Sequence, residues 1–275
     1  MSARAWLTIE RGDAPLVVSV PHTGLDLAGL EPRLASSWLA RKDADWHVER
    51  LYAFARELGA TFVRTAISRT VIDVNRDPSG ASLYPGQATT ELCPTTTFDG
   101  EPLYHDGAGL DEPEIAARKV EYFDPYDRAV HSEVTRLRAK HRNVVLWDCH
   151  AIRSIVPRLF EGELPEFNLG TNGGASADPA LERSVAKILA ASGRSHVVNG
   201  RFKGGWITRS FGEPHRGVHA LQMEVACRAY LREPLGAVSE ANWPPDYDEA
   251  FAAPVRKTLR AALQAALDWV RDDAP

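Results

Sequence analysis

Cysteine is scarce in this sequence. The 275 residues contain only Cys93, Cys149 and Cys227, which lie far apart and form no CxxC spacing. An odd number of distant cysteines argues against both a disulfide framework and a cysteine-rich zinc site. We therefore expect a protein of the reducing cytoplasm.

Long apolar stretches and a surplus of positive charge are also missing. No segment approaches the roughly 20 apolar residues that cross a bilayer, and residues 1–15 contain no continuous apolar signal-peptide core. The formal net charge is −5, and the lysines and arginines are scattered among acidic residues. These features argue against a membrane or a nucleic acid as partner, and we expect a soluble, unprocessed protein.

The sequence does contain an alternation of short apolar runs and amphipathic segments. Hydrophobic residues make up 44% of it, which suits one large α/β domain over residues 1–275. Strands separated by helices favour a mostly parallel sheet covered on both faces. We predict strands over 15–20, 60–66, 70–75, 144–150, 194–200 and 218–226, and helices over 48–58, 125–137, 179–189 and 255–270.

Aspartates mark the expected starts of three helices. Asp124 and Asp178 each precede a proline, the pattern of an N-cap followed by proline at the first helical position. Asp43 or Asp45 stands near the start of the helix over 48–58. Residues 78–112 are rich in Pro, Gly and Thr and lack periodicity, so we expect an inserted, ordered functional loop there.

Histidines occur where two predicted strands end. His22 closely follows the strand over 15–20, and His150 ends the strand that begins at Val144. Successive strand residues point to opposite faces, so Asp148 and His150 share a face and Cys149 lies on the other. The carboxyl ends of parallel strands form the ligand-binding edge of such a sheet, so we expect the site there.

Two imidazoles and one carboxylate are the ligand set of a catalytic zinc ion, which keeps one position open for water. The carboxylate can come from Asp43 or Asp45 in the segment KDADWH, or from Asp148, which otherwise orients a ligand histidine from behind. Asp43 and Asp45 could instead only cap a helix, and we expect His47 to be structural or to support the ligands from behind. Zinc is the default metal for this donor set.

A carboxylate also interrupts the apolar strand over 218–226. Glu224 lies there on the same face as Gln222, and a buried acid needs a partner or a function. We interpret Glu224 as a general base that acts on water at the metal. The alternative is a buried ion pair with a nearby arginine.

Several cations are candidates for binding an acidic substrate. Asn75 and Arg76 end the strand predicted over 70–75, and an arginine there can clamp a carboxylate through two hydrogen bonds. The alternative is a surface salt bridge between Arg76 and Asp73 or Asp77. Further cations follow within a glycine-rich segment, and the sequence does not rank them: Arg201, Lys203 and Arg209.

A series of short motifs resembles those of the N-formylglutamate amidohydrolase family, also called N-formylglutamate deformylases. The motifs span residues 17–230 or so and are, in order, SVPHTG, DADWHVERLY, VIDVNRDP, LYPGQ, LCPTTTFDGEPLY, LWDCHAIRS, PRLFEG, FNLGT and NGRFKGGWITR. The resemblance implies hydrolysis of N-formyl-L-glutamate to formate and L-glutamate in histidine degradation. It also implies a zinc exopeptidase-like fold, a three-layer α/β/α sandwich around a mixed, mostly parallel sheet.

The resemblance also implies roles for individual residues. It makes His22 and His150 metal ligands, Asp45 the third ligand and Glu224 the base. Two departures stand out. Leu25 occupies the position of the glutamate that exopeptidases have three residues after their first histidine, and Ala151 replaces the serine that is more frequent in the family after the second.

The implied substrate is a small acid with two carboxylates. We expect Arg76, beside Asn75, to hold one carboxylate and Arg209 to hold the other. Two other functions remain open. One is a zinc-dependent deacylase or carboxypeptidase-like amidase that acts on another N-acyl amino acid or on a cell-wall peptide. The other is a binding protein without catalysis, which would lack metal and tolerate loss of Glu224.

Overall fold

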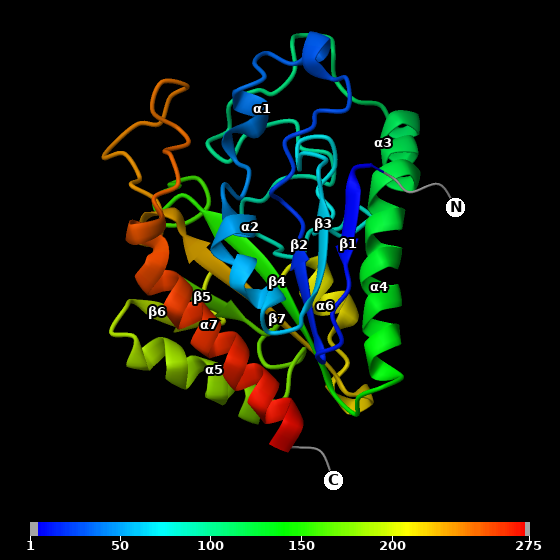
Figure 1. Ribbon diagram of the computed structural model, residues 1–275. Coiled ribbons are helices and arrows are strands. Elements are labelled where there is room, and N and C mark those ends of the chain that lie inside the picture. Colours follow the sequence, from blue (N-terminus) through cyan, green and yellow to red (C-terminus); the bar gives the residue numbers. More distant parts are fainter. Residues whose placement is uncertain (1–4, 273–275) are drawn as a thin grey trace.

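The computed structural model describes residues 5–272 and contains a seven-stranded sheet between two layers of helices (Figure 1). The strands lie in the order β1-β3-β2-β4-β7-β5-β6. Four neighbouring pairs are parallel, whereas β1 with β3 and β5 with β7 are antiparallel, so the predicted mixed, mostly parallel sheet is confirmed. The strands are β1 Leu7–Glu10, β2 Leu16–Val20, β3 Thr61–Thr65, β4 Val144–Ile152, β5 Phe167–Gly170, β6 His196–Val198 and β7 Val218–Ala226.

Helices cover both faces of this sheet. Figure 1 shows α4 and α6 on one side and α5 and α7 on the other. No helix in the described chain is both long and apolar enough to cross a membrane. The α-helices are α1 Leu39–Lys42, α2 Val48–Leu51, α3 Glu112–Arg118, α4 Asp124–Arg138, α5 Pro179–Ala191, α6 Trp206–Phe211 and α7 Glu249–Asp272.

Alternate residues of β4 enter two different hydrophobic cores. Val145, Trp147 and Cys149 cluster with apolar residues of α5 and α7. Val144 and Leu146 cluster with residues of α4 and α6. The strand is therefore buried on both faces, as its continuous apolar run predicts.

The prediction of a strand over residues 70–75 is wrong. These residues form turns instead: the Val71 amide donates to the Ser68 carbonyl, and the Asn75 amide donates to the Asp73 side chain. Val71 and Ile72 are buried without belonging to the sheet, so their apolar, β-branched character satisfies a buried turn as well as a strand. Conversely, β1 and β5 are short strands that the pattern did not predict.

The helix cap expected at Asp124 is also wrong. The helix that contains Asp124 begins earlier, at α3, where the Asp111 side chain accepts the Glu114 amide. A π-helical turn over Lys119–Phe123 joins α3 to α4, and it accommodates Pro125, which has no amide hydrogen to donate. Asp178 does cap α5, since it accepts the Ala180 amide.

The helix predicted over 48–58 is broken into α2 and a 3-10 helix over Ala53–Arg56. His47, in the left-handed region at φ 62°, precedes α2, and neither Asp43 nor Asp45 caps it. Between β3 and α3 the described chain has only isolated β-bridges, at Ile67, Thr96 with Pro102, and Tyr104. This segment includes the expected loop at 78–112.

Candidate metal centre and active site

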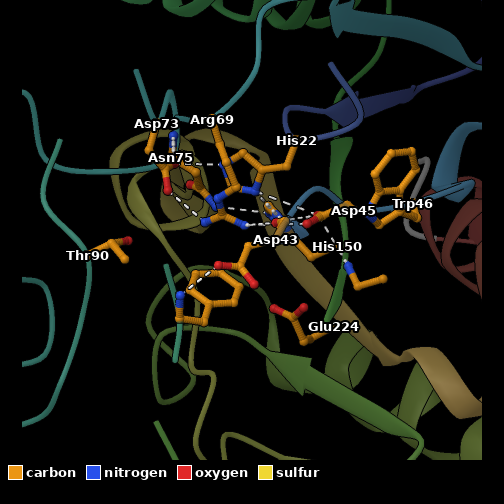
Figure 2. Close-up of polar contacts among 12 residues, drawn as sticks. His22, Asp43, Asp45, Trp46, Arg69, Asp73, Asn75, Thr90, His150 and Glu224 are labelled. Carbon is orange, nitrogen blue, oxygen red and sulfur yellow. Dashed lines mark hydrogen bonds and ion pairs between the residues drawn. The ribbon is translucent and has the colours of Figure 1, made fainter. Parts of the chain in front are cut away.

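Polar side chains converge beyond the carboxyl end of β2 and along β4 and β7. His22 lies two residues after β2, whereas His150 lies inside β4, which continues to Ile152. Asp45 comes from the segment between α1 and α2. Figure 2 shows these three side chains pointing toward one another. The sheet therefore brings together groups that are more than 100 residues apart in sequence.

The three side chains present one ligand atom each at short separations. Nδ1 of His22 lies 3.1 Å from Nδ1 of His150. Oδ2 of Asp45 lies 3.1 Å from Nδ1 of His150 and 3.6 Å from Nδ1 of His22. Ligands around a tetrahedral zinc ion with bonds of about 2.1 Å are about 3.4 Å apart. The separations here fit such a metal ion.

Two further carboxylates hold the outer nitrogens of both histidines. Nε2 of His22 donates to Asp73 at 2.7 Å, and Nε2 of His150 donates to Asp148 at 2.8 Å. Both Nδ1 atoms therefore face the shared space between the rings. A histidine ring held by a carboxylate in this way is the usual support of a metal ligand. Asp148 thus lies behind His150, the position expected if it orients this histidine and is not itself a ligand.

Asp45 and Asp43 point in different directions. Oδ2 of Asp45 accepts the Ala151 amide at 3.2 Å and faces the two histidines. Asp43 instead accepts the Phe98 amide at 2.6 Å and forms an ion pair with Arg153 at 3.2 Å. Of the three aspartates left open by the sequence, Asp45 is the one in the group that could hold a metal.

The charges in this cluster are buried but compensated. Burial raises the pKa of Asp45, but hydrogen bonds from His150 and His22 outweigh it and lower the pKa below its usual range. Burial lowers the pKa of His150, but Asp148 and Asp45 outweigh it and raise the pKa well above normal. Nδ1 of His150 lies between Asp45 and His22, a position where positive charge is stabilised. A metal cation suits that position, since metal binding to such a site displaces a proton.

Arg69 joins the carboxylate of Asp45 to that of Asp73, which holds His22. Its guanidinium donates to Asp73 at 2.7 Å and to Asp45 at 3.4 Å, and it lies over the Phe98 ring at 4.7 Å. Burial raises the pKa of Asp73, but His22 and Arg69 lower it well below the normal value. Arg69 was not predicted, because it lies in an irregular segment where spacing in the sequence does not indicate contacts.

Glu224 lies opposite His150 in the pairing of β4 with β7. Its carboxylate points toward the cluster in Figure 2, and it is 6% exposed. Gln222 donates to it at 3.4 Å. No ion pair to Glu224 occurs among residues 5–272, so the alternative of a buried ion pair with an arginine does not hold there. Burial raises the pKa of Glu224 to about 7, although the charge of His150 opposes the shift. A carboxyl group with this pKa can both accept and donate a proton near neutral pH.

A cavity opens beside the cluster. Arg76 lines it and donates to Thr90 at 3.1 Å, and Asn75 lines it while donating to Asp148 at 3.1 Å. Arg209 is not among the lining residues, whereas Arg201 is. The other residues that line the cavity include His22, Arg69, Tyr84, His150, Phe202, Gln222 and Glu224.

His47 does not belong to the group of His22, Asp45 and His150. Its Nε2 is 3.2 Å from the carbonyl of Pro245, and its ring packs against Tyr247. Asp73 was considered from sequence only as a salt-bridge partner of Arg76. Its contact with His22 joins two segments that are far apart in the sequence. The spacing of residues in a single sequence does not predict such a contact.

Comparison with known proteins gives consistent matches. The sequence model of the family "N-formylglutamate amidohydrolase" matches residues 14–231. N-formylglutamate deformylases of Pseudomonas aeruginosa and Pseudomonas putida are 44% and 43% identical over 268 and 265 residues, covering 97% and 96% of both chains. The crystal structure of N-formylglutamate amidohydrolase from Ralstonia eutropha JMP134 covers 98% of this chain and 100% of its own, with a TM-score of 0.79 and 22% identity. That structure shares the fold.

Proposed function

This chain belongs to the N-formylglutamate amidohydrolase family, and on that basis we propose that it hydrolyses the formamide C–N bond of N-formyl-L-glutamate to formate and L-glutamate. The observation that carries the proposal is the grouping of His22, His150 and Asp45 at a cavity that Glu224 also lines. We assign the reaction to histidine degradation, as the family resemblance implies. Three free cysteines support a cytoplasmic location.

The residues fit one divalent metal ion, and we propose zinc. Nδ1 of His22, Nδ1 of His150 and Oδ2 of Asp45 would hold it. Two imidazoles and a carboxylate match the donor preference of zinc, with a fourth position left for water. When bound, zinc supplies Lewis-acid polarisation and a water with a pKa lowered to about 7. Asp73 and Asp148 fix the ring orientations that this ligation needs.

Glu224 is the proposed general base and acid. Its carboxylate takes a proton from the attacking water as the oxygen bonds to the formyl carbon, and it then gives that proton to the leaving amine. Burial raises the pKa of this carboxyl above its usual value, which favours proton donation to the leaving amine. Its place opposite His150 keeps it on the ligand face of β7.

Arg76 is the proposed site for one substrate carboxylate, next to Asn75. It lines the cavity, and its Nε lies 3.6 Å from Asp73, so the ion pair with Asp73 considered as the alternative is present beside this role. Arg69, paired with Asp45 and Asp73, is less available for this role. The proposed partner is therefore a small acidic molecule.

A panel of N-acyl amino acids tests the proposal. Purified protein loaded with zinc should release formate from N-formyl-L-glutamate and should act much more slowly on N-acetyl-L-glutamate and N-succinyl-L-glutamate. Faster hydrolysis of an acetyl or succinyl substrate would support the broader deacylase function instead. Absence of hydrolysis across the panel would contradict an amidohydrolase role.

A further inference from the structure

Arg201 is a cavity residue whose charge has no acidic partner. Its Nε donates to the Leu159 carbonyl at 2.7 Å, and its Nη2 donates to the Ala88 carbonyl at 2.9 Å. Within the described chain, no carboxylate lies within ion-pair distance of it. Carbonyl oxygens orient a guanidinium but do not neutralise it. Arg201 therefore presents a full positive charge to the space that Arg76 and Glu224 also line.

The guanidinium of Arg201 is held in one orientation before any ligand binds. It lies 5.3 Å from the centre of the Tyr84 ring and 5.2 Å from that of Phe202. These ring contacts and the two carbonyl bonds tie it to four separate points of the cavity wall. A prearranged side chain loses little conformational entropy on binding, so it can discriminate between ligands.

The surroundings of Arg201 favour the arrival of an anion. The side chain is half-buried, and burial together with the charge of Arg76 lowers the pKa of Arg201 from its usual value. A carboxylate placed between Arg201 and Arg76 would reduce the repulsion between these two cations. A neutral amide would reduce it far less.

Arg209 is the other arginine considered for this role. Its Nε donates to the Gly204 carbonyl at 2.9 Å, and its guanidinium lies 4.8 Å from the centre of the Tyr84 ring. Tyr84 lines the cavity, but Arg209 itself is not a lining residue, whereas Arg201 is. The structure thus distinguishes two arginines that the sequence could not rank.

We propose that Arg201 selects substrates with a side-chain carboxylate, while Arg76 binds the α-carboxylate. This inference rests on the proposed function and deepens it. Arg76 is the neighbour of Asn75 and lies 3.6 Å from Asp73, the carboxylate that supports His22, so it adjoins the metal ligands. In N-formylglutamate, the α-carboxylate is close to the formyl group, and the side-chain carboxylate is two methylenes farther out. Arg201, held at the carbonyls of Leu159 and Ala88, is suited to that outer group.

The test compares N-formyl-L-glutamate with N-formyl-L-glutamine, which has the same shape and a neutral side chain. The wild type should prefer the glutamate substrate by about 10- to 100-fold in kcat/KM, the loss expected when a charge-assisted hydrogen bond cannot form. Arg201→Gln should reduce this ratio to within about threefold of one, mainly through a higher KM for the glutamate substrate. Arg201→Lys should restore part of the preference, because it keeps the charge.

Arg209→Gln is the matched comparison and should keep the wild-type ratio. A purely structural effect of Arg201→Gln would slow both substrates equally and leave the ratio unchanged, which would overturn the inference. A ratio that collapses in Arg209→Gln instead would assign the outer carboxylate to Arg209.

Calorimetric binding of L-glutamate and L-glutamine separates this inference from the proposed function. If the wild type releases no formate but binds L-glutamate more tightly than L-glutamine, and Arg201→Gln removes that difference, the reaction is wrong and the role of Arg201 stands. If the binding preference survives in Arg201→Gln, the role of Arg201 is wrong, whatever the reaction.

Discussion

The two faces of β4 and β7 differ sharply although they belong to the same strands. On the face toward α5 and α7, apolar side chains continue to the carboxyl ends: Trp147, Cys149 and Ala151 in β4, and Leu221, Met223 and Val225 in β7. On the face toward α4 and α6, apolar residues give way to polar ones: Asp148 and His150 in β4, and Gln222 and Glu224 in β7. Both faces are buried, so burial alone does not separate them.

The difference shows how one strand serves stability and chemistry at once. Neighbouring residues such as Met223 and Glu224 point to opposite sides of the sheet, so one can be changed without direct contact with the surroundings of the other. On the apolar face a side chain contributes through packing. On the polar face it contributes through charge, and each buried charge there needs a partner or a ligand. Substitutions on the two faces should therefore change different measured quantities.

The largest expected effect is on turnover, from the polar face. Glu224→Gln keeps the size of the side chain but cannot take a proton, so kcat should fall by about 100- to 10,000-fold. Bound zinc, measured by elemental analysis, should stay at the wild-type level, because Glu224 is not among the three grouped ligand residues. Near wild-type turnover would exclude Glu224 as the base.

Met223→Ala, one residue earlier, should act on stability instead. Met223 is fully buried among the side chains packed on α5 and α7, and its truncation should lower the free energy of unfolding by about 2–5 kcal/mol. The kcat of the folded fraction should remain close to that of the wild type. Urea unfolding measures the free energy of unfolding, and steady-state kinetics measure kcat. A large loss of kcat without a loss of stability would contradict the difference between the two faces.

The two faces should also differ in how stability depends on pH. Burial raises the pKa of Glu224 from 4.5 to about 7, so the folded protein binds this proton more tightly than the unfolded chain does. The resulting stabilisation is complete below about pH 4.5 and is lost as the pH rises through about 7. Metal-free wild type should therefore lose up to roughly 3 kcal/mol relative to metal-free Glu224→Gln between about pH 5 and 8. Urea unfolding curves that shift in parallel for both proteins would contradict the raised pKa.

A smaller effect, on zinc affinity, is expected for Asp73, which holds His22 from behind. Asp73→Asn removes the charge that holds Nε2 of His22, and zinc affinity should fall by about 10- to 100-fold. Competition with a chelating dye measures the dissociation constant. Asp77→Asn is a control on the same segment, since Asp77 contacts Ser79 and not a ligand histidine. Equal zinc affinities for the two variants would argue against the support that Asp73 is assigned.

Sequence patterns predicted the parts of this molecule in which one local signal dominates. The continuous apolar run of β4, the alternation of Asp148 with His150, and the cap at Asp178 each rest on local geometry. The turn around Val71 did not follow its pattern, because a buried turn accepts the same apolar residues as a strand. Residues 48–58 form two short helices in place of one, although the spacing of their apolar residues was helical.

The candidate site was predictable where a residue stands on or next to a regular strand. His22, His150 and Glu224 were found in this way, because strand position indicates direction. Asp73, Arg69 and the distinction between Arg201 and Arg209 depend on irregular segments, whose contacts are set by folding and not by spacing. These are the elements for which the structure adds most to the sequence.

The most direct test of the account is formate release from N-formyl-L-glutamate by protein stripped of metal and then reloaded. We predict that chelation abolishes formate release, that zinc restores it, and that the reloaded protein holds one zinc ion per chain. A His150→Ala variant treated in the same way should bind little zinc and release little formate. Full activity in thoroughly stripped protein, or zinc bound equally well by His150→Ala, would contradict a catalytic metal held at the carboxyl ends of these strands.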